Sequence, residues 1–410
     1  MREVLRDSRL RLTPARSTKG SFMSSAVIAP VCGVDRARTT LQQGRRSLSV
    51  GVEEEFLLVD RRTRLPVARG PRVVELATAV LGEQVQAEFF GAQVEVCTRP
   101  TADLAELRSE LALLRKVMGE VAASEGCLLV ATGTPVIPPG SPPTVTPGER
   151  YGRMTERWPA LVGSYDGMVC GCHIHVGVTG RGQALELANH MRPWLPTLQA
   201  LAANSPFSLG RDRGWASQRS VEHARWPGVG PAPLLDEVGY ERLADHLVKT
   251  GVLLDRRMIY WYARPSEHVP TLEIRVCDVN ADLDVVQLLT ALVRGLATTL
   301  LLDIGDGRPP PDVPAQGLHT AHRLAARHGS AGDGLDLLRG EYVPALTLAE
   351  RLLSRAAPGL AAVGDLGLAE ELLYRVRSSG GGAARQRAAY LRRGRLGDVV
   401  GDLVRATASG

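Results

Sequence analysis

The chain has 410 residues, of which 44% are hydrophobic and 23% charged, and its formal net charge is +5. This is an ordinary globular composition, long enough for a large core. Basic and acidic residues are mixed along the chain, and no basic helix or aromatic-interleaved stripe is present, so we do not expect nucleic-acid binding. Only three lysines occur, and no G-x-x-x-x-G-K-S/T sequence is present, which excludes a P-loop as the phosphate cradle.

The compartment is indicated by the first segment and by the cysteines. Residues 1–46 form a polar, arginine-rich leader without periodicity, which we expect to be disordered; Met23 is an alternative to Met1 as the true start. Its apolar stretch, 26–34, is too short for a signal peptide or a membrane span. No later stretch is long enough either, and the six cysteines form no C-x-x-C pair. We therefore expect a soluble, cytoplasmic protein that binds no membrane.

The first elements after the leader alternate between strands and helices. Period-two alternation predicts strands, whereas leucines at helical spacing and the capping-box start at Asp103 predict a long helix. Pro71 suits the first turn of a shorter helix. The predicted strands are 48–59, 86–97 and 127–132, and the predicted helices are 71–81 and the one from Asp103 to Gly126.

The middle and the end of the chain differ in character. Residues 133–150 hold six prolines and predict an irregular loop, as does the Arg-, Ser- and Gly-rich segment 204–231. Two short strands in succession, 258–264 and 269–277, are typical of an antiparallel hairpin. The other predicted elements are helix 151–160, strand 168–178, a helix from about 182, a helix at 237–250 and helices from about 281 to the end.

This order predicts an α+β fold in which helices cover a largely antiparallel sheet, because a doubly wound parallel sheet would need regular alternation to the end. We expect one catalytic domain over residues 47–410, helical from about 281.

Four of the predicted strands carry acids, imidazoles or guanidinium groups on one face. Residues two apart in a strand share a face. A water-exposed polar face is the simplest explanation for any one strand. Four such strands side by side would crowd several carboxylates, which repel one another unless cations are bound. The residues on these faces are Glu53, Glu55, Glu95, His173, His175, Glu273 and Arg275.

Carboxylates with an occasional imidazole suit Mg²⁺ or Mn²⁺. Zinc is the alternative for a His-x-His strand, but Cys172 points away from His173 and His175 in regular strand geometry. Arg219 follows a Gly- and Ser-containing stretch, where the backbone can approach a ligand, and is the candidate for binding phosphate. Arg264 lies near the predicted hairpin.

Six segments, in order and spacing, resemble the type 2 glutamate–cysteine ligase family of bacterial carboxylate–amine ligases. The resemblance covers roughly residues 48–392, and the set is more specific than any one motif. The segments are GVEEEFLLVD, VEVCTRP, GERYGRM, CGCHIHVGV, NSPF and PTLEIRVCD. More remotely, His-x-His followed by an E-x-R strand is similar to glutamine synthetase, which implies a curved antiparallel sheet that forms one side of an active-site funnel.

The resemblance implies that ATP phosphorylates the γ-carboxylate of glutamate and that an amine, cysteine's in the named activity, displaces phosphate from the acyl phosphate. It implies that Mg²⁺ bridges the ATP phosphates. Arg275 would steady the acyl phosphate or the substrate carboxylate, and His175 and Arg264 would contact substrate. Arg219 and Asn204 would bind the nucleotide. The implied metal ligands are Glu53, Glu55, Glu95, His173 and Glu273.

One position departs from the family pattern. Family members commonly have G-T-H-P after the strand at 127–132, whereas this chain has Pro135 directly after Gly133 and Thr134. The amine acceptor is therefore open, and the same ligase chemistry on a different amine is an alternative. A metal-dependent hydrolase and a non-catalytic binding protein are further alternatives, and the sequence leaves a homo-oligomer open.

Overall fold

A seven-stranded sheet organises the chain in the computed structural model, which describes residues 47–163 and 167–409. The hydrogen-bonded strand order is β2-β3-β1-β5-β9-β8, and β4 pairs with β1 off this path. Every pairing in this sheet is antiparallel, which confirms the predicted α+β class. The strands are β1 (Val50–Asp60), β2 (Val85–Ala87), β3 (Gln93–Cys97), β4 (Cys127–Val130), β5 (Gly171–Gly177), β8 (Ala263–Pro265) and β9 (Thr271–Asp278).

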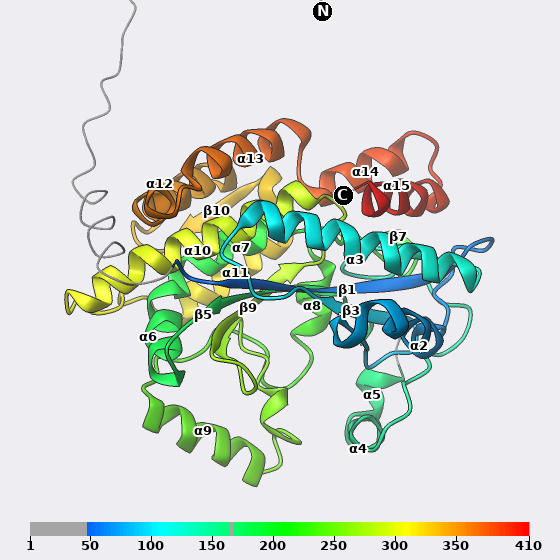
Figure 1. The fold of residues 1–410 in the computed structure, drawn as a ribbon, viewed down its shortest axis with the longest axis horizontal. Coiled ribbons are helices and arrows are strands. Elements are labelled where there is room, and N and C mark those ends of the chain that lie inside the picture. Colours follow the sequence, from blue (N-terminus) through cyan, green and yellow to red (C-terminus); the bar gives the residue numbers. More distant parts are fainter. Residues whose placement is uncertain (1–46, 164–166, 410) are drawn as a thin grey trace, which may run out of the picture. The chain divides into compact units, whose positions relative to one another are not determined.

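Helices pack on both sides of this sheet, as Figure 1 shows, with α3, α10 and the C-terminal helices on one side and α2, α4, α5 and α9 on the other. The helices are α2 (Gly70–Leu81), α3 (Leu104–Ser124), α4 (Glu149–Arg157), α5 (Pro159–Val162), α6 (Arg181–Met191), α7 (Leu195–Ala202), α8 (Gln218–His223), α9 (Glu237–Lys249), α10 (Leu283–Gly305), α11 (Ala315–His328), α12 (Ala345–Val363), α13 (Leu366–Ser379), α14 (Gly382–Leu391) and α15 (Leu396–Ala408).

The predicted boundaries hold for the long elements and fail where the chain turns sharply. The expected strand 86–97 is two strands, β2 and β3, because the chain reverses between Ala87 and Gln93 and the two pair with each other. The expected helix 151–160 is two helices, since Pro159 begins α5. The expected strand 258–264 shrinks to β8, because a 3₁₀ turn, Arg256–Met258, occupies the start of that segment.

The prediction that the chain is helical from about 281 is wrong in one place. A two-stranded hairpin of β10 (Asp333–Asp336) and β11 (Glu341–Pro344) interrupts the helices. Gly340 has a φ of 69°, a left-handed conformation that allows the tight reversal between the two strands. Its strands are too short for their alternation to stand out in the sequence. The predicted leader, residues 1–46, lies outside the described residues.

Two findings bear on the expected soluble character. Among the described residues, one helix, α10, is long and apolar enough to cross a membrane, but 89% of its most apolar window is buried within the protein. This is the pattern of a core helix in a soluble protein. The five cysteines within the described residues are free thiols, four of them buried, and Cys97 is half-buried.

Candidate metal and substrate site

Strand register brings the polar side chains of four strands onto one continuous surface. On β1, Glu55 pairs with Glu95 of β3, and Glu53 pairs with His173 of β5. On the far side of β5, His175 pairs with Glu273 of β9. Residues that pair across antiparallel strands point to the same face of the sheet. The sheet therefore gathers the acids and imidazoles that the sequence could only assign to separate strands.

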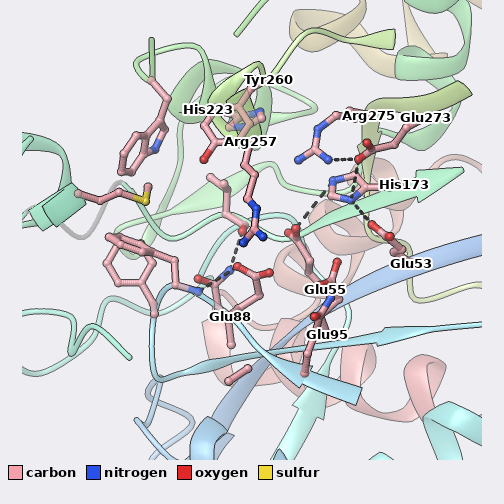
Figure 2. Close-up of a pocket in the computed structure, with 18 of the residues that line it drawn as sticks. Glu53, Glu55, Glu88, Glu95, His173, His223, Arg257, Tyr260, Glu273 and Arg275 are labelled. Atoms are coloured by element: carbon pink, nitrogen blue, oxygen red, sulfur yellow. Dashed lines mark hydrogen bonds and ion pairs between the residues drawn. The ribbon is translucent and has the colours of Figure 1, made fainter. Parts of the chain in front are cut away.

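His173 lies at the centre of this group. Its Nδ1 is 3.0 Å from a Glu53 carboxylate oxygen and 3.9 Å from Glu273 Oε1, and its Nε2 is 3.8 Å from Glu55 Oε1. Figure 2 shows the carboxylates of Glu53, Glu55 and Glu273 turned toward this ring. Two sets of potential metal ligands result, each with its ligand atoms within 4.8 Å of one another: Glu53, His173 and Glu273, and Glu55, Glu95 and His173.

The charges of the group favour a bound cation. Burial, together with the carboxylates of Glu88, Glu53 and Glu55, raises the pKa of Glu95 well above its ordinary value. Loss of water and the charge of Glu55 raise the pKa of Glu88 to about 7. Burial and the nearby Arg275 lower the pKa of His173, so its ring is neutral at pH 7 and can offer a nitrogen to a metal. A divalent cation would remove the repulsion between these carboxylates, so the residues present fit Mg²⁺ or Mn²⁺.

Two arginines neutralise the β9 end of the group. Arg264 Nε donates to Glu273 Oε2 at 2.8 Å, and Arg275 forms an ion pair with the same carboxylate. Burial alone would raise the pKa of Glu273, but the two guanidinium groups outweigh it and hold the pKa below its ordinary value. The Arg275 guanidinium also lies over the Tyr260 ring, 5.7 Å from its centroid. Arg264 Nη1 also donates to the carbonyl oxygens of Arg257 and Ile259, whereas Arg275 Nε has no hydrogen-bond partner among the described residues.

Arg219 reaches the same surface through a gap at Gly171. A Cβ at Gly171 would lie 2.4 Å from Arg219 Nη2, so only glycine leaves room for this side chain. The side chain is 3% exposed. Among the described residues, Arg219 Nε, Arg275 Nε and His173 Nε2 are buried and have no hydrogen-bond partner. Buried polar atoms are normally satisfied, so the two arginine N–H donors and the His173 nitrogen indicate where a ligand binds.

The structure does not bring Asn204 to this surface. Asn204 is buried, and its side-chain amide donates to the carbonyl oxygens of Ala131 and Val279, while its oxygen accepts a hydrogen bond from Gln386. It lines neither of the two large cavities described below. Pro135 is likewise absent from both linings. These contacts join Asn204 to three separate segments of the chain, and they do not support the expected contact with nucleotide.

Sequence reasoning missed several residues of the site. Glu88 lies in the turn between β2 and β3, outside any regular strand, so period-two alternation could not assign it to a face. Tyr260, His223 and Arg257 come from irregular segments or a short helix end, and Figure 2 shows them above the acidic group. Tyr260 lies three residues after Arg257 in the sequence, and its local pattern did not mark it as a site residue.

Two large cavities meet at the acidic group. The first, of about 490 Å³, is lined by the acids, by five arginines that include Arg219 and Arg275, and by several aromatic rings. The second, of about 570 Å³, lies over the start of β1 and the end of β5. Among the described residues, Glu53 and His175 are its only charged or titratable lining residues apart from Cys97. Glu53 and His175 line both cavities, so these two residues mark the boundary between a charged space and an uncharged one.

Comparison with known proteins places this site in a family. Residues 49–402 match the model of glutamate–cysteine ligase family 2. The chain belongs to that family. It is 42% identical over 343 residues to the "Putative glutamate–cysteine ligase 2" of Salinispora tropica, a match that covers 83% of this chain and 90% of the relative. A similarly named relative from Saccharopolyspora erythraea is 42% identical over 356 residues, 86% of this chain and 93% of its own. The chain is accordingly an ATP-dependent ligase.

Solved structures show the same fold at low sequence identity. The glutamate–cysteine ligase of Francisella tularensis, solved in complex with AMP, has a TM-score of 0.65 and 13% identity over 89% of each chain. A bifunctional glutathione synthetase from Pasteurella multocida has a TM-score of 0.68 and 16% identity over 92% of this chain. This chain spans 54% of the length of that bifunctional protein.

Proposed function

We propose that the protein joins the γ-carboxylate of glutamate to an amine, with cysteine as the family's named acceptor, in an ATP- and Mg²⁺-dependent reaction that passes through an acyl phosphate. A γ-carboxylate oxygen attacks the γ-phosphorus of ATP, and ADP leaves with the electron pair of the broken P–O bond. The amine nitrogen then attacks the carbonyl carbon and gives up a proton, and phosphate leaves with the electron pair of the C–O bond. The products are a γ-glutamyl amide, ADP and phosphate.

The observation that carries this proposal is that two carboxylate–imidazole sets and several arginine side chains line the same cavity. Glu53, His173 and Glu273 would hold one Mg²⁺, and Glu55 and Glu95 with His173 nearby would hold another. When bound, the metal neutralises charge on the phosphoryl group in transfer. A binding protein without phosphoryl chemistry gains nothing from keeping these acids together, since their repulsion costs stability.

The two cavities suggest which substrate each holds. Glutamate carries two carboxylates and suits the first cavity, where Arg264 and Arg275 can donate hydrogen bonds to a carboxylate. The nucleoside of ATP is uncharged and suits the second cavity, where no arginine or lysine occurs among the described lining residues. The phosphates would then cross the boundary at Glu53 and His175. This arrangement places the γ-phosphorus beside the metal ligands and the substrate carboxylate.

The chain's own groups have separable tasks in this arrangement. Arg275 stays protonated at every physiological pH and would bind the carboxylate that is phosphorylated, while Tyr260 beneath it fixes its orientation. His175 is hydrogen-bonded through Nδ1 to Thr271 Oγ1 at 2.8 Å, so its Nε2 points to the boundary and would contact substrate. Arg219 would contact a phosphate or substrate oxygen through the gap at Gly171.

The test is to incubate the full-length protein with ATP, Mg²⁺ and glutamate and to measure ADP release together with product mass. Hydroxylamine is included because this small nucleophile traps an acyl phosphate as γ-glutamyl hydroxamate without needing a binding pocket. We expect hydroxamate and ADP in equal amounts, both dependent on glutamate and Mg²⁺. ADP release that does not depend on glutamate, or hydrolysis without hydroxamate, would overturn the proposal.

A further inference from the structure

One end of the first cavity is aromatic, in contrast to its charged middle. Aromatic residues make up 4% of the chain, yet five of them line this cavity. Four lie away from the strands that carry the acids, in the turn after β2, in α4 and in the segment after α8. The aromatic residues that line the cavity are Phe89, Phe90, Tyr151, Trp226 and Tyr260, and Met154 lies among them.

Phe89 is the centre of this aromatic end. Its ring centroid lies 4.8 Å from Phe90, 5.1 Å from Tyr151 and 5.8 Å from Trp226, and the interplanar angles are 74°, 82° and 88°. Edge-to-face contacts of this kind fix ring orientation and are favourable beyond the area they bury. Behind them, Trp158 contacts Trp226 at 6.2 Å but does not line the cavity. The rings thus form a pre-organised apolar wall with one further ring in support.

This wall begins next to the acidic group. Glu88 precedes Phe89 in the chain, its carboxylate accepts a hydrogen bond from the Phe89 backbone N–H at 2.9 Å, and its side chain also hydrogen-bonds with Glu95. A molecule resting on the rings would therefore have its polar end within reach of the group where the acyl phosphate is proposed to form.

We infer that the aromatic wall is the acceptor subsite and that the preferred acceptor is a primary amine carrying an aromatic or bulky apolar group. This inference rests on the proposed function. Glutamate is drawn to the arginines and the nucleoside to the uncharged second cavity, so the aromatic end is left for the amine. A side chain as small as that of cysteine would cover little of the wall, whereas a ring could make edge-to-face contacts with Phe89, Tyr151 and Trp226.

The experiment compares acceptors and variants in the full-length enzyme with ATP, Mg²⁺ and glutamate. The acceptors are phenethylamine, ethylamine, cysteine and hydroxylamine. We expect kcat/KM for phenethylamine to exceed that for ethylamine by about tenfold or more, because a few buried apolar carbons discriminate by that much. The variant Tyr151→Leu should lower the ratio of phenethylamine to hydroxylamine turnover by about tenfold. The matched control, Trp158→Leu, should leave that ratio within about twofold, since Trp158 does not line the cavity.

The outcomes separate the inference from the function on which it rests. Absence of hydroxamate in the wild-type enzyme would overturn the proposed function and the acceptor inference with it. Hydroxamate formation with ethylamine used as well as phenethylamine would overturn the acceptor inference alone. An equal change of the ratio in Trp158→Leu and Tyr151→Leu, with both variants folded by thermal unfolding, would show that the rings act only as packing, which also overturns it.

Discussion

The acidic residues on the two faces of β1 have different hydrogen-bonding surroundings. On the helix-covered face, Glu54 is fully buried and meets Arg115 of α3, with Nε to Oε2 at 2.9 Å and Nη2 to Oε1 at 2.5 Å. Arg115 also donates to the carbonyl oxygens of Asn280 and Ala281. On the other face, Glu53 and Glu55 share their surroundings with further acids and with buried donors that have no partner among the described residues.

The difference shows how to distinguish a structural acid from a functional one. Glu54 is a closed pair whose hydrogen-bonding groups are used within the protein, so its charge contributes to stability. On the open face, Glu88 and Glu95 have raised pKa values, so their negative charge costs stability until a cation or substrate binds. Glu53 and Glu273 have lowered pKa values, because imidazole and guanidinium groups lie next to them. Substitution of neighbouring residues on one strand should therefore produce opposite phenotypes.

The largest expected effect is on activity, from Glu55→Gln. The amide keeps the shape and can still accept the Gly171 N–H, but it removes the negative charge from a proposed metal set. We expect kcat for glutamate-dependent ADP release to fall by about a thousandfold, as when one charge-stabilising group is lost from an active site. The free energy of unfolding should stay unchanged or rise, which urea denaturation measures. Near-normal turnover would remove Glu55 from the metal site.

The reverse result is expected from Glu54→Gln. Breaking this pair leaves Arg115 as a buried charge without its partner, which costs about 3 kcal/mol or more in free energy of unfolding. The proposed metal sites lie on the other face, so the folded fraction should keep its affinity for Mg²⁺. Urea denaturation and metal titration at low temperature measure the two quantities. A variant as stable as wild type would show that the pair does not have the structural role we assign to it.

A smaller effect tests the proposal that the two cavities bind different substrates. Gly51 lies on the floor of the second cavity, where an added Cβ would come no closer than 3.8 Å to Thr98 Oγ1, so a larger side chain fits and projects into the open space. We expect Gly51→Leu to raise the KM for ATP by about tenfold and to leave the KM for glutamate unchanged. Steady-state kinetics with each substrate varied in turn gives both values. A selective change in the glutamate KM instead would mean that the two substrates occupy the opposite cavities.

The smallest effect concerns the pH dependence of stability without metal. Because the pKa of Glu88 is raised to about 7, the folded state holds a proton between about pH 4.5 and 7 that the unfolded state has lost. Stability should therefore fall as the pH rises through this window, with a slope of at most about 1.4 kcal/mol per pH unit. Glu53 and Glu273 have lowered pKa values, so their contribution is lost only below about pH 4.5. Thermal unfolding should show the decrease in wild type and a flatter profile in Glu88→Gln and with saturating Mg²⁺; a flat wild-type profile would contradict the assignment.

The alternation of residues in the sequence was enough to predict which side of each strand is polar. It predicted that Glu53 and Glu55 share a face and that His173 and His175 share another. It could not predict that β1 lies between β3 and β5, because strand order depends on long-range pairing and not on local pattern. It put Glu54 on the opposite side from Glu53 and Glu55, but it could not identify the partner of Glu54, Arg115, which lies on a helix 61 positions away.

The irregular segments were the harder part of the site to predict. Glu88 and Phe89 occupy a turn, where side-chain direction follows from the particular backbone and not from a repeat. The aromatic end of the cavity assembles from segments far apart in sequence, so composition alone gave no sign of it. For Asn204, the motif led us to expect a contact with nucleotide. The structure instead buries its side chain, which donates hydrogen bonds to backbone carbonyl oxygens.

The central claim is that the open face of the sheet is a divalent-cation site and that the covered face is not. The most direct measurement is titration of Mn²⁺ into the substrate-free protein, with free Mn²⁺ followed by electron paramagnetic resonance. We predict saturable binding in the wild type and in folded Glu54→Gln, and a large loss of binding in Glu55→Gln and Glu273→Gln. Binding by Glu55→Gln and Glu273→Gln that equals that of wild type would contradict the claim.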